Sequence, residues 1–188
     1  MRGVVCTILL TLSSCAAPPV TLYALGASGV RGAVVPLRPG SVVIEVARVT
    51  LPDYLDTQDI LVRRGSALET SHTGRWASRL SLGATELLAG ILAQTRPEAL
   101  VTDQPQTAAP AYRLSINISR LDVTTEQAGR ATLDADWLIV PRDPALPARR
   151  DRIRLSADGP VATDQAVVTL ETTLLTRLAH AIDITRLR

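Results

Sequence analysis

Lysine and phenylalanine are both absent from this chain of 188 residues, and aromatic residues make up only 3% of it. Without lysine, the chain can form neither a Walker A phosphate loop, which ends in Gly-Lys-Ser/Thr, nor a lysine Schiff base. Because phenylalanine is absent, aliphatic residues and alanine must fill the interior. The chain is 46% hydrophobic, and its length suits one ordinary domain with a core rather than two sizeable ones.

An excess of charge of either sign is also lacking. The 20 basic residues, all of them arginine, are balanced by 18 acids, which gives a formal net charge of +2. The arginines are spread along the chain, whereas binding to duplex nucleic acid requires a concentrated basic face. We therefore expect no nucleic-acid partner.

Cysteine is scarce, and both copies, Cys6 and Cys15, lie at the start of the chain. Residues 1–3 carry one arginine and residues 4–12 are mainly apolar, which is the pattern of a secretory signal peptide. A membrane span needs about 20 apolar residues, so this run is too short to be one. The following Leu12-Ser13-Ser14-Cys15 resembles a bacterial lipobox.

A lipobox at the end of an apolar run predicts a signal peptide over residues 1–14 and lipidation of Cys15. Several acyl chains on one residue anchor a protein stably, whereas a single chain binds membranes only marginally. Ordinary secretory cleavage near Ala16-Ala17 is the alternative. Because Cys6 leaves with the signal peptide, the mature chain has no pair of cysteines for a disulfide.

Residues 15–41 are predicted to form the lipidated N-terminus and a flexible tether that holds the body off the bilayer. Pro18-Pro19 disfavours a helix. Residues 26–32 are glycine-rich but do not match G-x-G-x-x-G, so a linker is favoured over a phosphate-binding loop. Residues 20–25 are apolar and are a candidate edge strand.

The body, residues 42–188, is predicted to be a single α/β domain. Alternating apolar residues predict strands that begin near residues 42, 59, 112, 131 and 153. Apolar residues at helical spacing predict one helix over residues 75–94 and a second helix that starts near Thr163, whose hydroxyl can cap it. His72 is expected in a polar loop before the first helix, and residues 102–110 in another loop. An antiparallel meander with two main amphipathic helices indicates a sandwich built on a mixed sheet.

Few side chains suit catalysis or metal binding. His72 and His180 have no recognisable partner, and no cysteine stands at metal-ligand spacing. No Gly-x-Ser-x-Gly nucleophile elbow occurs. Asp134 and Asp136 share a strand face, as paired catalytic acids can, but the alternation turns that face towards solvent. We therefore expect no enzyme, no metal and no cofactor.

The densest basic cluster consists of Arg149, Arg150, Arg152 and Arg154. Guanidinium groups bind lipid phosphates in bidentate fashion, which would suit a membrane contact. Charged residues also protect the edge strand of a sheet from pairing with other chains. The second interpretation is favoured.

Several motifs together resemble one family. The lipobox and first strand are followed by Leu51-Pro52-Asp53-Tyr54-Leu55-Asp56, Gln58-Asp59-Ile60 and Arg75-Trp76-Ala77. This order resembles the ABC-type transport auxiliary lipoprotein family, the family of PqiC-like intermembrane transport lipoproteins. The order matches over most of the mature chain, and the motif similarity is confined to residues 51–80. The family's tryptophan is usually followed by Ala-Glu-Pro-Leu, whereas Ala77-Ser78-Arg79-Leu80 follows here.

The resemblance implies a non-enzymatic lipoprotein that works beside an ABC transporter and an MCE-domain protein in moving lipids between envelope membranes. The expected location is the periplasmic face of the outer membrane, because Ala16-Ala17 replaces the aspartate that holds enteric lipoproteins in the inner membrane. A generic scaffolding lipoprotein and, less favoured, a lipoprotein hydrolase are the alternatives. The sequence is compatible both with a homo-oligomer and with direct contact between this subunit and phospholipid.

The segments 53–59 and 72–76 are the best candidate for a surface that binds a partner. For the motif residues 51–80, a structural role is favoured over direct binding of a partner, because a tryptophan such as Trp76 can fix the start of a helix to the core. The candidate surface residues are Asp53, Tyr54, Asp59, His72, Arg75 and Trp76.

Overall fold

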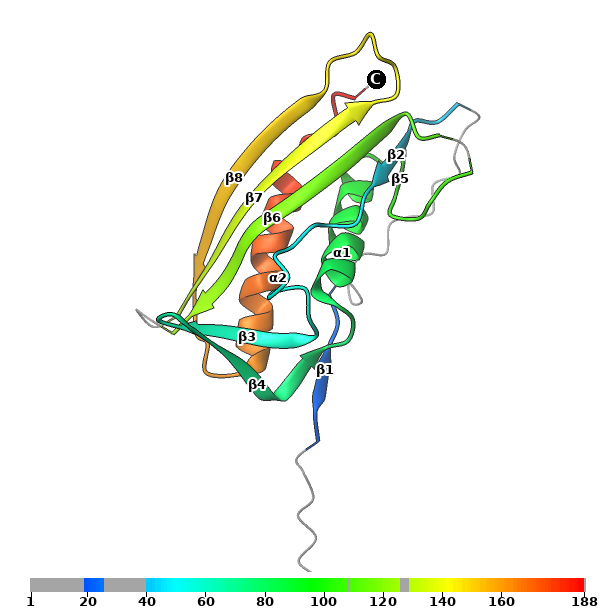
Figure 1. Ribbon diagram of the computed structural model, residues 1–188. Helices are drawn as coiled ribbons and strands as arrows, with labels where there is room; N and C mark the ends of the chain where they lie inside the picture. The colour runs from blue at the N-terminus through cyan, green and yellow to red at the C-terminus, as the bar shows by residue number, and fades with distance from the viewer. Residues whose placement is uncertain (1–18, 26–39, 108, 126–128, 188) are drawn as a thin grey trace, which may run out of the picture.

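The computed structural model describes residues 19–25, 40–107, 109–125 and 129–187. The predicted signal peptide, Cys15 and most of the predicted tether lie outside these ranges. Within them, no helix has the length and apolar character that crossing a bilayer requires. The described residues form one body, in which a long bent sheet wraps around two helices (Figure 1).

In the described ranges, the sheet has eight strands, and the two helices are α1 (Leu80–Thr95) and α2 (Asp164–Ala181). The strands are, in chain order, β1 (Thr21–Tyr23), β2 (Val43–Val46), β3 (Asp59–Arg64), β4 (Ala67–Trp76), β5 (Leu100–Thr102), β6 (Tyr112–Thr124), β7 (Arg130–Pro141) and β8 (Arg149–Asp158).

The sheet is mixed. β6, β7 and β8 form an antiparallel meander, and β3 and β4 form an antiparallel hairpin. β2 runs parallel to both β5 and β6, and β1 runs parallel to β4. The predicted fold class, a single α/β domain with a mixed sheet, an antiparallel meander and two main helices, is confirmed.

The long strands follow the alternation that the sequence predicts. In β6, Leu114, Ile116 and Ile118 are buried while the residues between them are exposed. The register with β7 shifts between Ile118 and Arg120, as a β-bulge does, and buried positions then continue at Leu121. The inward side chains of β6 and β7 pack into a common core beneath the helices.

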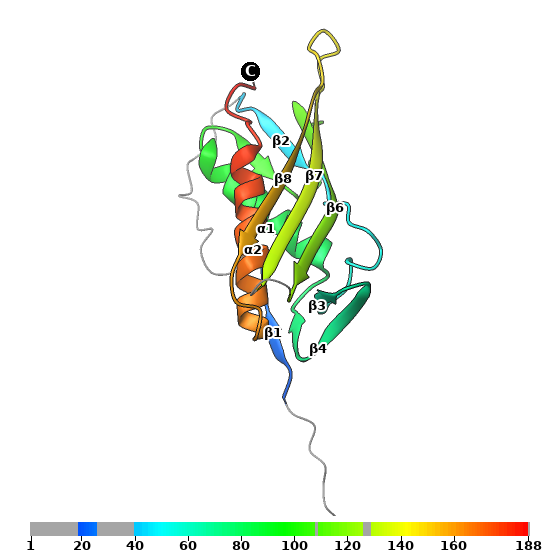
Figure 2. The ribbon, with the colours of Figure 1, turned by 90° about the vertical axis from the view of Figure 1, so that its left-hand side faces the viewer.

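Both helices cover the same face of the long strands and pack against each other (Figure 2). α2 begins where the sequence predicts, because the Thr163 hydroxyl accepts a hydrogen bond from the Ala166 amide at 3.2 Å. Asp164 in the first turn also suits the positive end of the helix dipole.

The prediction that the first helix begins near Arg75 is wrong, as is the prediction that His72 lies in a loop. Residues 67–76 form β4, and α1 begins at Leu80. Trp76 stands four residues before Leu80, a helical spacing, but its amide donates to the Gln58 carbonyl at 2.7 Å. Pairing with β3 and β1 therefore outweighs the local periodicity.

Two short strands extend the sheet at its margins. β5 pairs with β2 and was not predicted, because its three residues are too few to show a pattern. β1 lies in the candidate edge strand at residues 20–25, which is confirmed, and Leu25 just beyond it is 6% exposed. The folded body therefore includes residues 19–25, within the segment predicted as a tether.

Candidate interaction surface

The motif Leu51–Asp56 forms a tight turn whose two leucines point inward. The Pro52 carbonyl accepts hydrogen bonds from the amides of Leu55 and Asp56, at 2.9 and 3.2 Å. Leu51 and Leu55 are buried in the core. Asp53 and Tyr54 are thereby held at the surface, with Tyr54 41% exposed.

Asp56, at the end of the same motif, caps α1. Its Oδ1 accepts a hydrogen bond from the Ser81 amide at 3.2 Å, and the neighbouring Thr57 carbonyl accepts one from the Leu80 amide at 3.1 Å. Arg79, at the N-cap position itself, provides no capping side chain. The amides at a helix start need acceptors, and here a distant loop supplies them.

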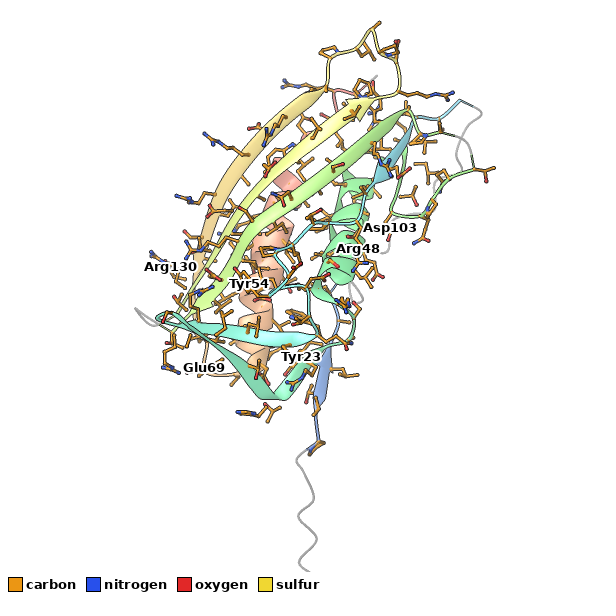
Figure 3. The ribbon with its side chains drawn as sticks, in the orientation of Figure 1. Tyr23, Arg48, Tyr54, Glu69, Asp103 and Arg130 are labelled. Atoms are coloured by element: carbon orange, nitrogen blue, oxygen red, sulfur yellow. The ribbon has the colours of Figure 1, made fainter. Side chains whose placement is uncertain are left out.

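Further polar contacts fasten this loop to α1. Arg48 reaches the first turn of the helix (Figure 3), where its Nε and Nη2 donate to Ser81 Oγ at 3.0 and 2.7 Å. The Val49 amide donates to Thr85 Oγ1 at 2.9 Å. These bonds satisfy two buried polar residues of α1 and fix the loop to the first two turns of the helix.

The surroundings of Asp56 favour its charged form. Partial burial raises the pKa of Asp56, but the hydrogen bonds from Ser81 and the positive charges of Arg48 and Arg79 outweigh burial. The pKa of Asp56 therefore lies below its ordinary value. A negative charge is thus held at the positive end of the α1 dipole.

Asp59 and Arg75 are brought together across the β3–β4 hairpin. Arg75 Nε lies 3.0 Å from Asp59 Oδ1, and Arg75 Nη1 donates to the carbonyl of Ser71 and, at 2.8 Å, to that of Gly74. Both charged groups are partly exposed, but each already has partners within the protein. Their contacts hold the end of β4 in its bent course.

Trp76 directly follows Arg75 and is only 2% exposed. Its backbone pairs with Tyr23 of β1 and bonds to Gln58 at the start of β3. A side chain so buried offers a partner no surface. These contacts support the structural role for Trp76 over direct partner binding.

The six candidate residues do not form a single surface. Asp53 and Tyr54 lie on the exposed turn, while Asp59 and Arg75 pair with each other. His72 is exposed in β4 beside Thr73, whose hydroxyl donates to Asp164 of α2 at 2.7 Å. The exposed turn and His72 are therefore the parts of the predicted surface that face solvent.

A charged cluster that the sequence analysis missed lies where β3 meets β6. Asp122, 6% exposed, accepts from Arg63 Nη2 at 3.0 Å and from Arg120 Nε at 2.7 Å. Burial raises the pKa of Asp122, but these two arginines lower it below the ordinary value. The Arg63 pKa is raised, first by its bond to Asp122 and further by Tyr54. Through Tyr54, the exposed turn thus contacts the charged cluster of Arg63, Asp122 and Arg120.

Glu171, in the middle of α2, is buried among apolar residues, and its Oε2 has no hydrogen-bond partner within the described residues. Burial raises the pKa of Glu171 to about 8, and the negative charge of Asp122 adds to the shift. The neutral, protonated form is therefore favoured at pH 7. The sequence offers no signal for this residue beyond an acid within an apolar helix stripe.

The arginine cluster lies on β8, which forms one edge of the sheet, and its four arginines are exposed. Arg150 and Arg154 form ion pairs with Asp136 and Asp134 on β7. These pairs support the interpretation of a charged strand edge. They also give the two aspartates a role other than catalysis.

The described ranges contain no group of three His, Cys, Asp or Glu side chains placed to hold a metal ion.

The sequence matches the family of ABC-type transport auxiliary lipoprotein components over residues 23–183. The chain belongs to this family. The match begins in β1 and ends just after α2, so it spans nearly all of the folded body. Members of this family are auxiliary components of transport systems, and the family is not an enzyme family, as expected. Membership associates the protein with an ABC transport system.

Two solved structures share the fold. An uncharacterized protein is 15% identical with a TM-score of 0.69, over 87% of this chain and 95% of that chain. Protein XCC0632 from Xanthomonas campestris, of family DUF330, is 17% identical with a TM-score of 0.58, over 86% and 91% of the two chains. Among curated proteins, none matches this sequence.

Proposed function

We propose that this protein is a lipid-anchored periplasmic subunit that helps an ABC transporter and an MCE-domain protein to move phospholipid between envelope membranes. The observation that carries the proposal is the order of features along the chain. The family match begins at residue 23, soon after the lipobox cysteine, Cys15. A membrane anchor placed directly before a transport-auxiliary domain suits a subunit that works at a membrane surface.

The proposed anchor is the lipidated Cys15, exposed when residues 1–14 are removed. Ala16-Ala17 follows it, with no acidic residue that would retain the protein in the inner membrane. We therefore place the protein on the periplasmic face of the outer membrane. There it would receive lipid from a path that begins at the ABC transporter in the inner membrane.

The proposed contact with the MCE-domain partner is the turn bearing Asp53 and Tyr54. Its backbone is held by two hydrogen bonds to Pro52 and by two buried leucines. A turn that is already ordered loses little conformational entropy on binding. Tyrosine is also enriched among residues that contribute most to interfaces.

Co-purification tests this function. The full-length protein, extracted from membranes in detergent, should retain an MCE-domain protein, and Tyr54→Ala should weaken this retention several-fold. Leu146→Ala is the matched control, because Leu146 is 42% exposed against 41% for Tyr54. If the wild-type protein retains no MCE-domain protein in any detergent tested, the scaffolding alternative is favoured.

A further inference from the structure

The position of β1 limits how far the body can stand from its anchor. Thr21 pairs with Gly74 in β4, and Leu25 is buried against α1, where its Cβ approaches Gly83. Only residues 16–20 lie between Cys15 and β1, so Thr21 can lie at most about 22 Å from Cys15 when the chain is fully extended. The headgroup layer of a leaflet takes up about 5–8 Å of this reach. The point at which β1 starts must therefore lie close to the bilayer.

Three segments meet at this point, and we call them together the anchor end: residues 19–25, 70–74 and 159–163. Thr21 pairs with Gly74, and Thr73 bonds to Asp164, which directly follows the third segment. The lower parts of Figures 1 and 2 show β1, the bend of β4 and the start of α2 close together in both views.

The anchor end is poor in charge, although Glu69, Arg75, Asp158 and Asp164 directly flank its last two segments. None of its three segments contains Asp, Glu or Arg, although 20% of the whole chain is charged. Its exposed side chains include Val20 and Leu22, which are 51% and 66% exposed. Among the large hydrophobic side chains of the described residues, Leu22 is the most exposed. Exposed apolar side chains on a surface poor in charge suit the boundary between headgroups and acyl chains.

The opposite end of the body has a different character. The connection between β7 and β8 lies there (Figure 1) and contains Arg142 and Asp143, and Arg149 and Arg150 begin β8. β6, with its 13 residues, is about 43 Å long, about twice the reach of the linker. The linker therefore holds one particular end of the body at the membrane.

We propose that the anchor end docks on the phospholipid surface, with Val20 and Leu22 inserted at the headgroup boundary and His72 and Ala162 facing the headgroups. This inference rests on the proposed function, because it requires a lipid on Cys15. The body then stands with its long strands rising from the membrane. The charged β7–β8 connection is directed away from the membrane, towards the periplasm.

A fluorescent label on a single introduced cysteine tests the docking. Cys15 would be the only cysteine of the mature chain and is blocked by its lipid, so an introduced cysteine is the only free thiol. His72→Cys and Ala162→Cys place labels on exposed positions of the anchor end that are far from Cys15 in sequence. Arg150→Cys places the same label at the opposite end and serves as the control.

The labelled full-length proteins are reconstituted into vesicles of phosphatidylethanolamine and phosphatidylglycerol, with and without nitroxide-labelled lipid. Quenching at His72 and Ala162 should exceed quenching at Arg150 at least threefold. Leu22→Asp should reduce the quenching at both positions while the protein stays bound to the vesicles. Equal quenching at the two ends would overturn the docking.

Mass spectrometry of Cys15 separates the two proposals. If Cys15 carries lipid but the anchor end is not quenched, the docking is wrong and the lipoprotein function stands. If Cys15 carries no lipid, both the anchor and the docking are overturned.

Discussion

The carboxylate of Asp56 lies 3.2 Å from the amide nitrogen of Ser81, 25 residues further along the chain, and so caps the start of α1. The bond joins the loop that bears the exposed turn to the first turn of α1. Arg48 strengthens the junction by donating to both residues, to Ser81 Oγ at 2.7 Å and to Asp56 Oδ2 at 3.4 Å. The motif Leu51–Asp56 therefore fixes the exposed turn against α1.

Removal of this cap should destabilise the protein. Asp56→Ala leaves the Ser81 amide without its acceptor, and loss of a capping side chain costs about 1–2 kcal/mol. Urea unfolding followed by tryptophan fluorescence measures the change. Asp53→Ala, at an exposed residue of the same turn, is the control and should change stability by less than about 0.5 kcal/mol. An equal effect of both substitutions would contradict the capping role.

The buried Glu171 should make stability depend on pH. Its pKa is raised to about 8 in the folded protein, from an ordinary value of 4.5. The folded state therefore holds a proton that the unfolded state releases, so its stabilising contribution is complete below pH 4.5 and is lost as the pH rises towards 8. Over this range the free energy of unfolding should fall by about 1.4 kcal/mol per pH unit.

Glu171→Gln should remove that dependence, because an amide does not titrate. Urea unfolding at several pH values between 5 and 8 gives the slope for both proteins. Glu86→Gln, an exposed acid on α1, is the matched control and should keep the wild-type slope. A wild-type slope that persists in Glu171→Gln would show that other groups set the pH dependence.

The long elements were predictable because local patterns determine them. β6 and β7 alternate between apolar and polar residues, and Thr163 caps α2 as its position predicts. β4 was not predictable, because its polar run from Glu69 to Gly74 shows no alternation and pairs through its backbone with β3 and β1. The cap at Asp56 also escaped prediction, since its partner is distant in sequence. Contacts of this kind are created by the fold and leave no local signal.

The two tryptophans should both be essential to stability. Trp76 and Trp137 are 2% and 6% exposed, and truncation of a buried tryptophan to alanine costs about 3–5 kcal/mol. Thermal unfolding of each variant gives the measurement. Tyr54→Ala, at an exposed aromatic residue, should be far milder. If Trp76→Ala leaves the melting temperature unchanged but abolishes transport, the residue would be a contact and the structural role would be wrong.

Cys15→Ala should release the protein from the membrane or leave its signal peptide uncleaved, because Cys15 is the only acylation site that the lipobox offers. Metabolic labelling with a palmitate analogue should mark the wild-type protein and not the variant. Sucrose-gradient fractionation of the labelled cells should recover the wild type with outer-membrane markers. Continued labelling of Cys15→Ala would refute the lipobox. Recovery of the labelled wild type with inner-membrane markers would instead refute only the choice of membrane, because the anchor itself would still be present.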